Sequence, residues 1–184
     1  MTAQEAASCA AKNFLNGCNC AQAVLGVFAE SLGLETRDAM RLAQPFGGGM
    51  CRLRETCGTV TGMLLALGLL EGNSDPSDKA AKDAVYAHGQ ALTAEFKKLH
   101  GSIQCRELLG LVPLGTADAV LHGAPLPVRT VEHKKTDSVS LNGTALSPAS
   151  ELRTEDYYAR RPCPKLCASA AQIFAEYMDA RKQT

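Results

Sequence analysis

Apolar side chains recur at helical spacing along most of the chain. Between residues 21 and 32, Val24, Leu25, Phe28 and Leu32 repeat every three or four positions, as on the buried face of an amphipathic helix. The same periodicity, with residues that typically begin or end helices, predicts further helices. We expect these over residues 4–15, 36–42, 75–99 and 164–180, with short helical segments starting near residue 105.

Residues 57–70 follow a different pattern, because they are apolar on nearly every side after the first turn. A helix that is apolar all round is typically enclosed by other helices, so we expect this one at the centre of the fold. Its glycines, Gly58, Gly62 and Gly68, each cost about 1 kcal/mol relative to alanine. We therefore expect another backbone to approach the helix closely at these positions.

Residues 111–155 differ from the rest in composition. Four of the eight prolines lie here, at Pro113, Pro125, Pro127 and Pro148, and only residues 124–131 favour a brief extended piece. We expect a long surface loop that could contain a small hairpin. The predicted fold is therefore all-α: residues 1–184 form a single-domain, cysteine-rich helical bundle with a central apolar helix, and residues 111–155 form an irregular excursion.

Charge and hydropathy restrict the partners and the location. Nineteen basic residues balance nineteen acidic ones without a basic stripe, which argues against nucleic acid as the main partner. The N-terminus lacks the pattern of a signal peptide, and the most apolar stretch, residues 63–70, is shorter than the roughly 18 residues that span a membrane. We expect a cytoplasmic protein without a membrane span; a homodimer is an open alternative, because two-fold assemblies are common.

Eight cysteines are an unusual number for a chain of this kind. Five lie at or near predicted helix starts, where exposed N–H groups and the helix dipole lower a thiol pKa and favour the thiolate. These five are Cys20, Cys51, Cys57, Cys105 and Cys163. The alternative for each is packing, because a buried cysteine behaves as a small hydrophobic residue. Placement most favours a shared site for Cys57, Cys105 and Cys163.

The remaining thiols and the glycines before Cys51 each have two interpretations. We expect Cys9 to be filler, and Cys18 to be either a spare thiol or a metal ligand shared with Cys20. Cys167 lies one helical turn after Cys163 and could resolve a disulfide, add a ligand or simply pack. Gly48 and Gly49 could direct N–H groups at sulfurs or at a bound anion, or form a tight turn.

Nearby arginines could also serve a thiol site. Arg52, Arg54 and Arg106 flank Cys51 and Cys105 and could hold a thiolate or an acidic partner. For Arg54 we favour a solvated surface position.

Cysteine spacing matches no established metal motif. The chain contains no CxxC pair, and neither the zinc-finger nor the ferredoxin spacings occur. Ligands from separate helix starts could still converge, and four thiolates suit an iron–sulfur cluster.

Four stretches nevertheless resemble a known family in their order. They are NCAQAV at residues 19–24, FGGGMCRLRETCGTVTG at residues 46–62, CRELLG at residues 105–110, and Cys163. Together they are similar to a family of small, cysteine-rich microbial proteins described as "putative redox-active" and named for the pattern C, GCAxxG, C, C. The resemblance implies that Cys20, Cys57, Cys105 and Cys163 are the family's four cysteines. Thr59 stands where the family motif has alanine, Cys51 has no counterpart, and residues 111–155 are longer than the usual connection.

Three hypotheses follow for the function. The first is electron transfer through an iron–sulfur cluster bound by Cys20, Cys57, Cys105 and Cys163, with Cys51 in reserve. The second is dithiol–disulfide exchange, in which Cys57 or Cys163 attacks and Cys51 or Cys167 resolves the mixed disulfide. The third is a structural zinc or soft-metal site without catalysis. The first two require a redox partner protein that the sequence does not identify.

Overall fold

The structure, a computed structural model, describes residues 1–115, 140–141, 144–145 and 147–182, so the extended piece predicted at residues 124–131 lies outside it. The described part is all-α apart from one small hairpin, as predicted. Its α-helices are α1 (Ala3–Leu15), α2 (Cys20–Phe28), α3 (Thr36–Ala43), α4 (Gly58–Glu71), α5 (Lys79–His100), α6 (Cys105–Leu108), α8 (Glu155–Ala159) and α9 (Cys163–Arg181). Two 3-10 turns, η1 (Glu30–Leu32) and η2 (Gln44–Phe46), and strands β1 (Ser140–Leu141) and β2 (Thr144–Ala145) complete it.

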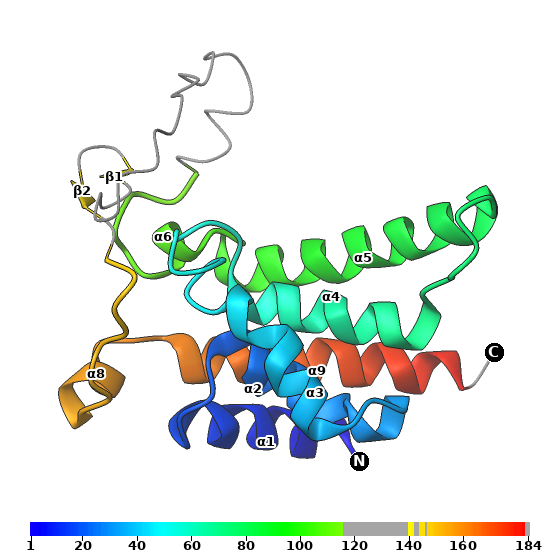
Figure 1. The fold of residues 1–184 in the computed structure, drawn as a ribbon, viewed down its shortest axis with the longest axis horizontal. Coiled ribbons are helices and arrows are strands. Elements are labelled where there is room, and N and C mark those ends of the chain that lie inside the picture. Colours follow the sequence, from blue (N-terminus) through cyan, green and yellow to red (C-terminus); the bar gives the residue numbers. More distant parts are fainter. Residues whose placement is uncertain (116–139, 142–143, 146, 183–184) are drawn as a thin grey trace, which may run out of the picture.

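The apolar helix α4 lies between α5 on one side and the layer of α2 and α9 on the other (Figure 1). Helix α1 packs along α9, and α3 packs on α2. Where these helices meet, the rings of Phe28 and Phe174 pack edge to face with their centroids 4.9 Å apart. Phe14 and Phe96 are also fully buried, so the largest side chains of the core come from several helices.

Side-chain caps fix where the first helices begin. Thr2 and Glu5 form a capping box at the start of α1, and Asn19 and Gln22 form another at the start of α2. The long helix α5 begins at Lys79 rather than at residue 75. Asp75 instead accepts a hydrogen bond from the backbone N–H of Ser77, and the Asp78 side chain caps the helix.

Close approach explains two of the three glycines of α4. A Cβ on Gly58 would lie 2.9 Å from the carbonyl oxygen of Phe46, and one on Gly62 would lie 2.7 Å from that of Ala21. The prediction was wrong for Gly68, because nothing lies within 4 Å of its Cβ position. This end of α4 is only partly enclosed, and Leu69 is 38% exposed.

Other predicted boundaries differ by a few residues. The helix expected over residues 21–32 ends at Phe28 and continues as the 3-10 turn η1, which Gly33 ends in a left-handed conformation. Leu99, in the last turn of α5, is 57% exposed, although Phe96 three residues earlier is fully buried. None of the helices that the structure describes is long and apolar enough to cross a membrane.

Candidate functional site

Four cysteines lie where helices start, as the sequence predicted. Cys20, Cys105 and Cys163 are the first residues of α2, α6 and α9, and Cys57 is the residue before α4. Each is buried, with at most 8% of its surface exposed. The chain therefore brings four thiols from distant segments to one end of the helical layers.

Local hydrogen bonds hold these helix starts together. The Asn19 side chain accepts from the backbone N–H groups at the start of α2 and donates to the carbonyl oxygen of Gln44 at 3.0 Å. Cys57 and Cys105 lie where two backbone segments pair in an isolated antiparallel bridge. There the Cys57 N–H donates to Ile103 and the Cys105 N–H donates to Glu55, each at 2.7 Å. Backbone bonds thus fix two of the four thiols relative to each other.

The buried thiols contact or influence one another. Cys20 and Cys163 share a hydrogen bond between their thiols, and Cys20 also bonds with the thiol of Cys167. The sulfur of Cys57 lies 3.1 Å from the hydroxyl of Thr59. Each of the five affects the pKa of another, and we call them the thiol cluster: Cys20, Cys57, Cys105, Cys163 and Cys167.

The prediction that helix starts lower the thiol pKa was wrong for this cluster. Burial, followed by repulsion from Cys105, raises the pKa of Cys57 to about 12 despite hydrogen bonds from Thr59. The hydrogen bond with Cys20, together with burial, raises the pKa of Cys163 strongly, and burial also raises those of Cys105 and Cys167. Burial penalises the charged form more than the helix N-termini favour it, so the thiols are protonated at neutral pH.

Cys20 and Cys163 differ in how their shared hydrogen bond acts. It lowers the pKa of Cys20, although the bond with Cys167, burial and neighbouring thiols raise that pKa by more. The same bond raises the pKa of Cys163. A thiolate on Cys20 would therefore accept a hydrogen bond from the thiol of Cys163.

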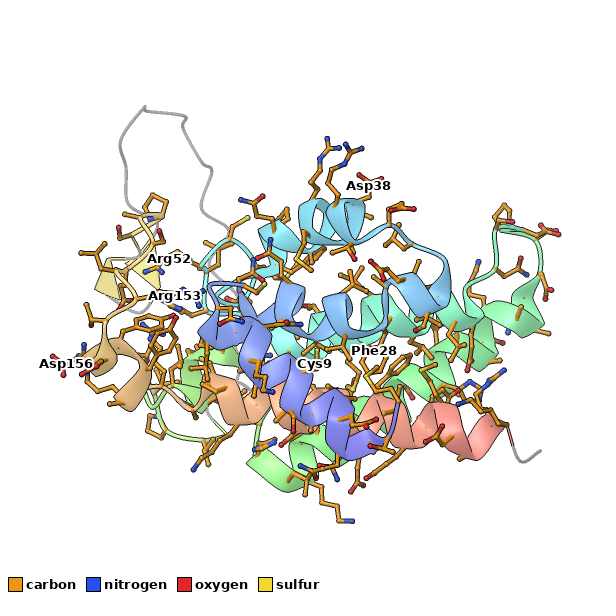
Figure 2. The ribbon with its side chains drawn as sticks, turned by 90° about the horizontal axis from the view of Figure 1, so that it is seen from below. Cys9, Phe28, Asp38, Arg52, Arg153 and Asp156 are labelled. Carbon is orange, nitrogen blue, oxygen red and sulfur yellow. The ribbon has the colours of Figure 1, made fainter. Side chains whose placement is uncertain are left out.

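A pocket of about 390 Å³ opens directly above part of the cluster. Cys20, Cys105 and Cys163 line it, whereas Cys57 and Cys167 do not. Its remaining wall is formed by loops and by α8, and it carries four arginines and a single carboxylate. The charged lining residues are Arg52, Arg54, Glu151, Arg153 and Arg161. Figure 2 shows Arg52 and Arg153 at the same end of the molecule, beside α8.

Residues 47–55 form part of this wall, and their backbone conformation is unusual. Met50, Cys51, Arg52 and Arg54 all have positive φ angles between 50° and 64°, which side chains rarely adopt. Each such residue costs roughly 1–3 kcal/mol and persists only where surrounding bonds hold it. Here the loop folds on itself through hydrogen bonds such as Arg52 N–H to Gly47 and Arg54 N–H to Gly48. Strain of this kind concentrates at functional sites.

The thiols have the donor chemistry of a metal site, but their arrangement does not fit one. In the part of the chain that the structure describes, no three His, Cys, Asp or Glu side chains converge so as to hold a metal ion. An iron–sulfur cluster or a zinc ion would therefore require the cysteine side chains to rearrange. The arrangement does fit sulfur–sulfur chemistry, because the thiols of Cys20 and Cys163 share a hydrogen bond.

The chain matches the sequence model of a known protein family over most of its length. The sequence model of the family described as "Putative redox-active protein (C_GCAxxG_C_C)" matches residues 18–177. The chain belongs to this family. The match includes every member of the thiol cluster and most of the pocket wall. Neither a curated protein nor a solved structure gives a match.

Two features that the resemblance singled out in the sequence have clear positions in this C_GCAxxG_C_C protein. Thr59, in place of alanine, leaves the start of α4 intact and places its hydroxyl against the sulfur of Cys57. The long connection between Cys105 and Cys163 does not separate them, since both line the pocket and Cys163 raises the pKa of Cys105.

The other residues that the sequence singled out occupy varied places. Cys51 is exposed and lines the mouth of the pocket, and Gly48 lines it as well. Gly49 lies against Cys105, where a Cβ would come within 2.7 Å of that residue's Cβ. Cys9 and Cys18 are half-buried and lie outside the pocket lining.

Sequence reasoning missed much of the charged wall. Arg54 was expected on the surface, but its side chain is 11% exposed and hydrogen bonds with Cys105. The sequence patterns did not indicate Glu151, Arg153 or Arg161 as site residues, although Arg161 lies two residues before Cys163. That proximity to a cysteine is the one signal that could have indicated it.

Proposed function

We propose that this protein carries out thiol–disulfide exchange through Cys20 and Cys163. The observation that supports it is the hydrogen bond between these two thiols on the floor of the pocket. Two sulfurs in contact can join as a disulfide after small side-chain movements, and the pocket gives a substrate access to them. The family description, redox-active, is consistent with a two-electron step of this kind.

The exchange would proceed in two steps. The thiolate of Cys20 attacks one sulfur of a substrate disulfide, forming a mixed disulfide and releasing the first substrate thiolate. The thiolate of Cys163 then attacks the sulfur of Cys20, which forms the Cys20–Cys163 disulfide and releases the second substrate thiolate. The two protein thiols are oxidised by two electrons in total, the substrate disulfide is reduced, and the two thiol protons pass to the released thiolates.

The order of attack follows from the neighbours of Cys20. Its thiol interacts with the thiols of both Cys163 and Cys167, so a mixed disulfide on Cys20 has a resolving thiol beside it. Arg161 then favours ionisation of Cys163, since its positive charge lowers the pKa of that thiol. Burial keeps both pKa values high, so the exchange rate should rise with pH through the neutral and alkaline range.

This assignment keeps one of the two attacking residues predicted from the sequence and changes its role. Cys163 becomes the resolving thiol. Cys57 is outside the pocket lining and has a pKa of about 12, which favours a structural position beneath the reacting pair. Cys167 could exchange with Cys20, because their thiols also share a hydrogen bond.

A trapping experiment tests the proposal. In the double variant Cys163→Ser/Cys167→Ser, Cys20 should attack a neutral probe, hydroxyethyl disulfide, and stay as a stable mixed disulfide that peptide mass spectrometry locates. In Cys20→Ser, no mixed disulfide should accumulate in the pocket. Cys9→Ser, which changes a half-buried thiol of α1, is the matched control and should behave as the wild type. An adduct on Cys57 or Cys51 in place of Cys20 would refute the assignment.

Binding of an iron–sulfur cluster by Cys20, Cys57, Cys105 and Cys163 is a second candidate. The shared burial of these four residues at one end of the fold favours it. Protein isolated without oxygen would then be brown, with iron and sulfide in stoichiometric amounts. Colourless protein without iron would remove this candidate, and zinc in its place would indicate a structural metal site.

A further inference from the structure

The wall of the pocket carries far more positive than negative charge. Three arginines converge on the carboxylate of Glu151: Arg161 at 2.5 Å, Arg52 at 3.3 Å and Arg54 at 3.8 Å. One carboxylate therefore pairs with three guanidinium groups. The side chains of these three arginines are each at most 22% exposed. Hydrogen bonds from Arg161 and Arg52 more than offset burial and lower the pKa of Glu151.

Arg153 differs from these three, because its donors are already committed. It donates to the carbonyl oxygens of Phe14 at 2.8 Å and Cys18 at 3.0 Å, and its guanidinium lies over the ring of Phe14. This arginine ties residues 147–154 to the end of α1. Each of the other three directs at least one guanidinium nitrogen at Glu151, and a ligand could take up those donors when the Glu151 side chain leaves.

The side chain of Glu151 could turn away from the arginines, because it is 43% exposed. Its segment, residues 147–154, has no regular secondary structure and is held by Arg153 and by the bond from Arg52 Nε to the carbonyl oxygen of Ser147. An incoming carboxylate could replace Glu151 while the arginines stay in place.

We propose that the pocket binds a small disulfide or thiol that carries a carboxylate, and that this carboxylate replaces Glu151 among Arg52, Arg54 and Arg161. The inference rests on the proposed exchange at Cys20 and Cys163 and names its substrate class. Guanidinium groups bind carboxylates through paired, charge-assisted hydrogen bonds, which gives both affinity and orientation. Arg54 links the two parts of the site, because it approaches Glu151 and also hydrogen bonds with Cys105 on the floor.

The size of the pocket agrees with a small substrate. Its volume of about 390 Å³ lies within the range of roughly 300–1,000 Å³ that is typical of small-molecule sites. A ligand with its carboxylate among the arginines could place a sulfur over Cys20 and Cys163, since all these residues line one cavity.

Three symmetrical disulfides of different charge test the inference. Dithiodiglycolate is anionic, hydroxyethyl disulfide is neutral and cystamine is cationic. Each reaction consumes one disulfide and two protein thiols, and yields the Cys20–Cys163 disulfide and two small thiols. Dividing each rate by that of the same disulfide with mercaptoethanol in solution removes differences in intrinsic reactivity. We expect the normalised rate for dithiodiglycolate to exceed that for cystamine by roughly tenfold at low salt, and the preference to shrink as salt is added.

Substitution of Glu151 sharpens the test. Glu151→Gln removes the competing carboxylate, so the preference for dithiodiglycolate should grow several-fold. Glu155→Gln makes the same change four residues later, at an exposed glutamate outside the pocket, and should leave the preference unchanged. Arg52→Gln should reduce it. Equal normalised rates for all three disulfides, with the Cys20–Cys163 disulfide still forming, would overturn the anion site and leave the proposed function intact.

A binding measurement separates the inference from the redox step. Thiodiglycolate is a thioether with two carboxylates and no disulfide to exchange. Calorimetry should show that it binds Glu151→Gln more tightly than the wild type and Arg52→Gln more weakly. If no disulfide forms with any reagent but this pattern appears, the proposed function fails and the anion site stands. If thiodiglycolate binds none of the variants, the anion site is wrong.

Discussion

The two ends of α4 hold buried ionisable groups in opposite states. At its start, Cys57 has a pKa raised to about 12, because burial and neighbouring thiols disfavour the thiolate. At its last residue, the side chain of Glu71 is only 7% exposed, yet its pKa is lowered. Burial raises the pKa of Glu71 as well, but hydrogen bonds with Tyr177 and His88 and the charge of Arg181 outweigh it.

The two ends differ in the groups that surround the ionisable side chain. The far end of α4 surrounds its carboxylate with donors and a cation, so the charge is stable and the site is structural. The thiol end surrounds Cys57 with a hydroxyl and other thiols, and its arginines act on the thiols that line the pocket, as Arg54 does on Cys105. A protonated, closely packed set of sulfurs beside a wall of arginines is suited to form and break disulfide bonds. The contrast between these ends can be tested in four ways.

At neutral pH, the largest expected effect of a single substitution comes from the glycines of α4. Gly58→Ala should destabilise the protein by about 1–3 kcal/mol, because the added methyl meets the carbonyl oxygen of Phe46 and the Cβ of Cys20. Gly68→Ala, near the far end of the same helix, has open space and should stabilise by about 0.5–1 kcal/mol. Urea unfolding measures both. Equal effects would contradict the close approach at the thiol end.

Alkaline pH should weaken the thiol end specifically. The folded pKa of Cys57 is raised from 9.0 to about 12, so its protonated form contributes stability below about pH 9 that is lost as pH rises toward 12. Each such thiol removes about 1.4 kcal/mol per pH unit in this window. We expect a steep fall of the urea midpoint above about pH 9, and a shallower fall in Cys57→Ala. Identical slopes would mean that the thiol of Cys57 ionises freely in the folded protein.

Loss of a donor at Glu71 tests the other end. Tyr177→Phe should destabilise by about 1–2 kcal/mol at neutral pH, because Glu71 loses a hydrogen bond. Since the pKa of Glu71 is lowered, this stabilisation is present above the ordinary value of 4.5 and disappears as pH falls. Tyr86→Phe changes an exposed tyrosine of α5 and should have no effect. If Tyr177→Phe lost the same amount of stability in acid as at neutral pH, Glu71 would be excluded as the cause.

The smallest expected effect concerns Thr59. Thr59→Ala restores the residue of the family pattern and removes the hydroxyl that lowers the pKa of Cys57. We expect a further rise of that pKa and a loss of about 0.5–1 kcal/mol of stability. Thr61→Ala, whose hydroxyl donates to the carbonyl oxygen of Gly58 instead, is the control. Thiolate absorbance during an alkaline titration measures the pKa of Cys57. If the two variants do not differ, the hydroxyl of Thr59 does not affect that pKa.

Local sequence patterns predicted the helix starts, and with them the positions of four thiols. Asn19 and Gln22 form a capping box whose hydrogen bonds depend only on neighbouring residues, so the start of α2 follows from the sequence. Cys57 follows in the same way, because an apolar run after it predicts a buried helix. The all-α class rests on the same local signals.

Long-range contacts decided what the sequence did not predict. Arg153 reaches the carbonyl oxygens of Phe14 and Cys18 from more than 130 residues away, so no local pattern places it at the pocket. The raised pKa values depend on how completely the thiols are buried, which is a property of the assembled fold. Helix periodicity reports which side chains face inward, and it does not report which charges they will meet.

The central claim is most directly tested by mapping the disulfide that the wild-type protein forms. Reduced protein prepared without oxygen is treated with one equivalent of hydroxyethyl disulfide, its free thiols are counted, and its peptides are analysed without reduction. We predict the loss of two of the eight thiols and a peptide pair joined through Cys20 and Cys163. Eight titratable thiols after treatment, or a bond that joins other cysteines, would contradict the account.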